Sequence, residues 1–170
     1  MSQISQSSVD FRSLVQSLRA TPDTLKHIAE GFRSEELTGC CPVGAWSFLE
    51  HICHLRDIEI EGYSVRIGRI LDEEYPVLSD IDGARLAAER DYMSEDFESV
   101  LTAFALERRQ NLEVVSTLSP KQLNRTAIFG DSGAITLLTL LEMMAEHDQD
   151  HLRQLEELCA FRSSKANAMR

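Results

Sequence analysis

The stretch AEHDQDHLRQLEEL, residues 145–158, decides which fold this chain can adopt. It belongs to a longer amphipathic helix, expected from about Thr136 to Phe161, whose apolar residues recur at spacings of three, four or seven. His147 and His151 lie on that apolar face, and side chains four residues apart on a helix are neighbours. Two imidazoles in this position either bind one metal ion or fill part of the core, and the rest of the chain has to distinguish these alternatives.

Two long helices are expected in the first half of the chain. One runs from about residue 9 to residue 31, with an interruption at Thr21-Pro22, where threonine can cap a helix and proline can occupy its first position. The other begins at Ser47, which has Glu50 three residues later and therefore has the form of a capping box. No proline interrupts this second helix for roughly 25 residues, a length of about 38 Å.

The second half of the chain adds a third helix between residues 94 and 119, for which Ser94 is the expected cap. A shorter helix around residues 81–92 precedes it. Strand propensity is confined to residues 126–129, which is too little for a sheet. The sequence therefore predicts an all-α fold, most simply a four-helix bundle with long second and fourth helices.

Length and composition are those of one globular domain. The chain has 170 residues, of which 43% are hydrophobic and 26% charged, so we expect a single bundle domain over residues 1–170 with flexible ends at 1–8 and 163–170. The formal net charge of -11 argues against nucleic-acid binding. Basic residues alternate with acidic ones, as in ERRQNLE, a pattern typical of a solvated helix face.

Location and cysteine chemistry are predicted from what the sequence lacks. It begins with the polar stretch MSQISQSSVD rather than a secretory signal, and its apolar runs are too short to span a membrane. We therefore expect a cytoplasmic protein with reduced thiols. Cys53 and Cys159 are expected to pack as small hydrophobic residues, whereas the role of the adjacent Cys40 and Cys41 stays open.

A second pair of histidines lies on the second expected helix, in the stretch EHICHLRD. Facing helices of a bundle can supply ligands to one ion, so this helix can complete a site with His147 and His151. His51 lies among the apolar residues of its helix, whereas His54 lies at their flank, close to carboxylates that could orient an imidazole. Periodicity does not choose between them. His27 is isolated and is expected on the surface.

Two signatures resemble those of the DinB-like superfamily, a group of metal-binding four-helix proteins. The first is WSFLE at residues 46–50, followed by His54, Asp57 and Glu59. The second is ITL at residues 135–137, followed by HDQDHLRQL at residues 147–155. Intervening stretches also resemble the family, so that the similarity covers most of the chain: RIGRILDEEYPVL (66–78), ERDY (89–92) and LERRQNL (106–112).

The resemblance implies a site for a divalent metal ion. In the family, the histidine eight residues after the tryptophan joins the HxxxH pair, which selects His54, His147 and His151 as ligands. Three imidazoles leave a coordination position open, and they suit zinc or nickel, with iron or manganese as alternatives. Asp148 is the first candidate for a general base because it neighbours both ligands in sequence, with Asp57 and Glu50 next.

The resemblance also implies two reaction classes acting on a small-molecule substrate. One is metal-dependent hydrolysis, and the other is S-transfer using a low-molecular-weight thiol such as bacillithiol or mycothiol. A homodimer is expected by the same analogy. The alternative hypothesis is a helical bundle that binds metal or a partner protein without catalytic turnover.

Overall fold

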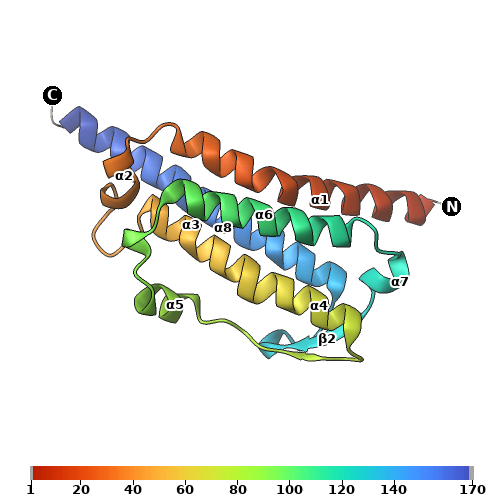
Figure 1. Cartoon of the computed structure of the whole chain (residues 1–170). Coiled ribbons are helices and arrows are strands. Elements are labelled where there is room, and N and C mark those ends of the chain that lie inside the picture. Colours follow the sequence, from red (N-terminus) through yellow and green to blue (C-terminus); the bar gives the residue numbers. More distant parts are fainter. Residues whose placement is uncertain (1, 169–170) are drawn as a thin grey trace.

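The computed structural model describes residues 2–168, and long helices dominate it (Figure 1). The helical elements are α1 (Ser2–Ala29), α2 (Ser34–Gly39), α3 (Phe48–Asp57), η1 (Ile58–Ser64), α4 (Val65–Asp72), α5 (Gly83–Glu89), η2 (Tyr92–Ser94), α6 (Phe97–Val115), α7 (Pro120–Leu123), η3 (Gly130–Ser132) and α8 (Leu137–Ala168). The strands are β1 (Val77–Leu78), β2 (Thr126–Phe129) and β3 (Ala134–Thr136).

Four long rods form the bundle: α1, the continuous unit α3–η1–α4, α6, and α8 (Figure 1). Helix α1 packs against α6 and α8, and α3 packs against the same two helices from the other side. Helices α1 and α8 run in one direction, and α3–α4 and α6 run in the opposite one (Figure 1). The prediction of an all-α four-helix bundle with long second and fourth helices is therefore confirmed.

The second rod begins with the predicted capping box. The Ser47 hydroxyl accepts a hydrogen bond from the Glu50 backbone N–H at 3.3 Å, and the Glu50 carboxylate accepts one from the Ser47 N–H at 2.7 Å. The rod extends to Asp72, but its middle part, η1, is a π-helix rather than an α-helix. Wider π turns shift the register of the side chains that follow, and within this segment Glu59 is 1% exposed.

The expected interruption of the first helix at Thr21-Pro22 is wrong, because α1 continues through Pro22. A proline inside a helix cannot donate to the carbonyl four residues earlier, which here belongs to Leu18. The Leu18 carbonyl instead accepts a hydrogen bond from the Arg108 guanidinium of α6 at 3.0 Å. A side chain from another helix therefore satisfies the group that Pro22 leaves unpaired.

The third long helix and the short helix before it begin later than the sequence predicts. Helix α6 begins at Phe97 and is capped by Asp96, whose carboxylate accepts from the Ser99 N–H at 2.9 Å, so the predicted cap at Ser94 is wrong. Ser94 ends a short 3-10 turn instead. The short helix expected around residues 81–92 is present as α5.

A small sheet is also present, contrary to the expectation that residues 126–129 could not form one. Strand β2 pairs in parallel with β1 and antiparallel with β3. Its partners are only two and three residues long, too short to give a strand pattern of their own. Gly130 and Gly133, both with positive φ, form the turn between β2 and β3.

Both ends of the described chain are helical in backbone, since α1 starts at Ser2 and α8 ends at Ala168. Residue 1 and residues 169–170, parts of the expected flexible ends, lie outside the described residues. The single-domain assignment of residues 1–170, and the flexibility of residues 1–8 and 163–170, stay predictions.

The interior of the bundle contains two apolar clusters with a polar layer between them. On α8, Leu140 and Met144 belong to one cluster and Leu155 and Leu158 to the other. The buried polar residues between the clusters come from all four rods and include Thr21, His51, His54, Asp57, Glu59, Arg108, Asn111, Asp148 and His151. Within residues 2–168, no helix combines the length and apolar character needed to cross a membrane.

Candidate metal centre

Three imidazoles from two rods converge on one point in the polar layer. His54 comes from α3, and His147 and His151 come from α8. The Nε2 atom of His147 lies 3.2 Å from Nε2 of His54 and 3.2 Å from Nε2 of His151. One ligand atom from each of the three residues lies within 4.8 Å of the others.

This spacing suits a metal ion. A tetrahedral ion with N–metal distances of about 2.0–2.1 Å holds its nitrogen ligands about 3.3 Å apart. Three imidazole nitrogens facing one point also cannot all satisfy one another, since each neutral ring offers only one N–H. The donor set of His54, His147 and His151 therefore fits a divalent ion of the kind that imidazole binds.

The structure separates the roles of the two histidines that the sequence left open. His54 brings its Nε2 to the cluster, whereas the Nδ1 of His51 lies 2.9 Å from the Nδ1 of His151. A hydrogen bond to the second ring nitrogen fixes the tautomer and orientation of a metal-binding histidine. His51 can therefore hold His151 with its Nε2 facing the other two rings.

Burial keeps these imidazoles neutral. It lowers the pKa of His51 and His54 to about 4 and that of His151 to about 2, with neighbouring histidines adding to the effect for His54 and His151. Burial also lowers the pKa of His147. Only a neutral imidazole nitrogen can bind a metal, so the site does not have to lose protons at neutral pH.

A glycine and a tryptophan enclose His54. A Cβ atom on Gly83, at the start of α5, would lie 2.3 Å from His54 Cε1 and 2.8 Å from its Nδ1. The indole of Trp46 packs on the other histidines as well, with ring centroids 5.0 Å from His54 and 6.2 Å from His151. The buried Nδ1 of His54 has no hydrogen-bond partner among the described residues.

Asp148 faces a different part of the polar layer. Its two oxygens accept hydrogen bonds from Arg108 at 2.6 and 3.0 Å, and one of them also accepts from the Thr21 hydroxyl at 2.7 Å. Arg108 also donates to Glu59 at 2.9 Å. These contacts favour a structural role for Asp148, and its predicted role as general base stays a prediction.

The two other candidate bases are also engaged. Asp57 accepts from Tyr92 at 2.6 Å and from Arg56 at 2.8 Å, and it forms an ion pair with Arg90. These donors outweigh the effect of burial and lower the pKa of Asp57. Glu50 caps α3.

Sequence analysis missed three contributors to the site: Trp46 as a packing partner, Gly83, and Arg108. Arg108 lies in ERRQNLE, which was interpreted as a solvated face, yet Arg108 is 2% exposed. Glu59 and Asp148, at buried positions of other helices, could have indicated a buried arginine, because buried carboxylates require a partner.

The remaining predictions about histidine and cysteine positions are confirmed. His27 is exposed on α1 and pairs only with Glu30 among the described residues. Cys53 is buried in an apolar cluster, and Cys159 packs against the same cluster. All four cysteines are free thiols in the structure.

A cavity of about 480 Å³ opens over the histidines. His51, His54 and His151 line it, together with Trp46. Gln154 and Glu157 of α8, both exposed, contribute the polar part of the lining. A small molecule can therefore approach the histidine cluster from solvent.

Comparison with known proteins identifies the class to which this fold and site belong. The chain belongs to the DinB superfamily, whose family model matches residues 3–155. A protein of Oceanobacillus iheyensis named "Putative metal-dependent hydrolase" is 27% identical over 145 residues, which cover 85% of this chain and 83% of that protein.

A solved structure has the same fold. It is YfiT from Bacillus subtilis, described as "a probable metal-dependent hydrolase with an unusual four-helix bundle topology". The two structures match with a TM-score of 0.81 over 89% of this chain and 87% of YfiT, at 23% sequence identity.

Proposed function

We propose that this protein is a metal-dependent hydrolase of small molecules, in which His54, His147 and His151 bind a divalent ion. The observation that carries the proposal is the convergence of three Nε2 atoms, with that of His147 3.2 Å from each of the other two, beside an open cavity that His54 and His151 line. The name of the Oceanobacillus relative supports the same reaction class. Zinc or nickel suits the ligands best, with iron or manganese as alternatives.

The ion would lower the pKa of a bound water to about 7 and polarise a substrate oxygen. The residues of the chain supply binding and orientation. His51 holds the ring of His151, Gly83 leaves room for the ring of His54, and Trp46 offers an apolar surface to the substrate. The three candidate carboxylates are all engaged in other contacts, so the proton released by the attacking water would pass to solvent in the cavity.

S-transfer with a low-molecular-weight thiol is the second reaction class that we propose. A divalent ion at the same site would lower the pKa of a thiol as it lowers that of water, and the cavity is wide enough to admit a thiol-bearing molecule. The homodimer and the cytoplasmic location stay predictions. Metal binding or partner binding without turnover is the alternative function.

The test is a set of assays on metal-free protein and on protein reconstituted with zinc, nickel, manganese or iron. We expect hydrolysis of activated esters or amides, or conjugation of a thiol to an electrophile, only with metal present. His147→Ala should reduce the rate by at least about 100-fold, as loss of a residue essential to catalysis does, and His27→Ala should leave it unchanged. Metal binding without any turnover over a broad substrate panel would favour the alternative function.

A further inference from the structure

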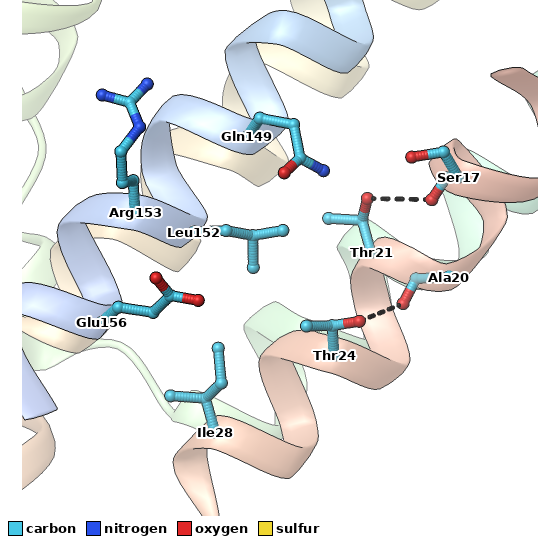
Figure 2. A pocket seen from close by; sticks show the side chains of 9 residues that line it. All are labelled: Ser17, Ala20, Thr21, Thr24, Ile28, Gln149, Leu152, Arg153 and Glu156. Carbon is cyan, nitrogen blue, oxygen red and sulfur yellow. Dashed lines mark hydrogen bonds between the residues drawn. The ribbon is translucent and has the colours of Figure 1, made fainter.

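The cavity over the histidines differs in charge from two other grooves of the bundle. No lysine or arginine of the described chain lines it, and Glu157 is its only formally charged lining residue apart from the titratable histidines. The groove between α1 and α8 is lined by Arg153 as well as by Glu156, and the Arg153 side chain points away from Glu156 (Figure 2). The groove between α1 and α6 contains Arg19 and Arg109. Of these three hollows in the described part of the chain, the one at the candidate site is the one that lacks a lysine or arginine.

The two arginines whose charges act on His147 do not provide an anion site either. Arg66 and Arg108 both lower the pKa of His147, but neither lines the cavity. Arg108 donates to two buried carboxylates. Arg66 donates to the Ser79 carbonyl at 3.0 Å and to Asp80 at 3.3 Å. Both guanidinium groups are therefore engaged by partners within the protein and are not available to bind an anionic ligand.

Trp46 provides a surface suited to a cation or an apolar group. The indole is half-buried, and its plane lies within 5° of the His151 ring. Tryptophan binds organic cations through the negative potential of its face. Glu157 forms no ion pair within the described chain, so its carboxylate is free to attract a positive group near the cavity mouth.

From this arrangement we infer that the part of the substrate lying between Trp46 and Glu157 is neutral or positively charged. The inference rests on the proposed function, because it concerns the substrate of the same site. The positive charge of a metal ion would attract an electron-donating group at the end of the substrate nearest the histidines. The outer end meets a carboxylate and an indole, so organic ammonium groups are favoured and carboxylates or phosphates there are disfavoured.

Trp46 is the only tryptophan of the chain, so its fluorescence reports directly on the cavity. The experiment titrates the full chain, with and without zinc, with two probes of the same aromatic body and opposite charge, benzyltrimethylammonium and phenylmethanesulfonate. We expect the cation to bind metal-free protein roughly tenfold more tightly than the anion. Glu157→Gln should reduce this ratio by roughly threefold, as expected for one exposed carboxylate.

Glu156→Gln is the matched control, because Glu156 is the adjacent residue of α8 but lines the α1–α8 groove (Figure 2). It should leave the ratio unchanged. Equal binding of the two probes, tighter binding of the anion to metal-free protein, or binding of neither probe would overturn the inference. So would an effect of Glu157→Gln no larger than that of Glu156→Gln. Zinc binding is measured on the same samples, so that a failure of the proposed metal site is recognised separately from a failure of the charge preference.

Discussion

Gly83 lies against His54, one of the three proposed metal ligands, at a place where a side chain would not fit. Alanine at position 83 would place its Cβ 2.3 Å from a ring atom of His54, so the ring or the start of α5 has to move. We expect Gly83→Ala to weaken zinc binding roughly ten- to 100-fold, the usual effect of disturbing a residue that orients a ligand. Titration against a zinc chelator measures this change.

Gly68→Ala is the control for that substitution, because a Cβ at Gly68, within α4, would meet nothing within 4 Å. It should leave zinc affinity unchanged and stabilise the helix slightly, since alanine favours helix over glycine. Equal zinc affinities in Gly83→Ala and the unmodified protein would show that His54 is not held by this contact.

Histidine burial predicts how stability depends on pH in the metal-free protein. The pKa is about 4 for His51 and His54 and about 2 for His151 in the folded chain, below the ordinary value of about 6.5 in the unfolded chain. Between these values the unfolded chain binds more protons, so the free energy of unfolding falls as the pH decreases from 6.5 toward 4. We expect each of these histidines to contribute a loss on the order of 3 kcal/mol, measured by urea denaturation at several pH values.

His151→Leu should reduce this pH dependence, because a leucine at the same buried position binds no proton. His27→Gln, on the exposed face of α1, should leave it unchanged. If the metal-free protein were equally stable at both ends of this range, the imidazoles could not be neutral and buried as described.

Part of the candidate site could be predicted from the sequence. The HxxxH spacing placed His147 and His151 on one helix face, because that relation depends only on helix geometry. Choosing between His51 and His54 required the family resemblance, since both lie within one turn of a buried helix. The contact between His51 and His151 joins two segments about 100 residues apart, and no local pattern reports such a contact.

The helices are connected through the Arg108 guanidinium. Arg108 of α6 donates to the Leu18 carbonyl of α1, to Glu59 of η1 and to Asp148 of α8. Burial lowers the pKa of Arg108, but the two carboxylates outweigh this effect and hold the pKa above its ordinary value. One cation therefore bonds to all three of the other rods.

Replacement of Arg108 should consequently destabilise the whole bundle. Arg108→Met leaves two buried carboxylates without their cation and the Leu18 carbonyl without its donor, and we expect a loss of about 3–5 kcal/mol. Chemical denaturation measures it. Arg109→Met, at the adjacent exposed position with a 3.9 Å ion pair to Glu113, should change stability by no more than about 0.5 kcal/mol. Similar losses in the two variants would contradict the role assigned to Arg108.

Element prediction from the sequence succeeded where local signals decide and failed where distant contacts decide. The capping box at Ser47 and the length of the helix that follows are local properties, and both were predicted. The continuation of α1 through Pro22 depends on Arg108, about 90 residues away. Strands β1 and β3 become strands only by pairing with β2, so their sequences alone did not indicate a sheet.

In the molecule as a whole, the polar layer connects the four rods of the bundle and also contains the candidate metal site. Two consecutive residues of α8 divide these roles. His147 faces His54 of α3 in the candidate site, whereas Asp148 accepts hydrogen bonds from α1 and α6. The three proposed ligands come from two rods and meet only when the bundle has formed. Metal binding should therefore stabilise the folded chain, since an ion that binds only the folded state shifts the equilibrium toward it.

Zinc stoichiometry tests the central claim most directly. Protein purified without a histidine tag is stripped of metal, equilibrated with zinc and measured by elemental analysis, together with His27→Ala and the triple variant His54→Ala/His147→Ala/His151→Ala. We predict one zinc ion per chain in the unmodified protein and in His27→Ala, and none in the triple variant, provided that circular dichroism shows it to be folded. An unmodified chain that binds no zinc, or a triple variant that retains it, would contradict the account.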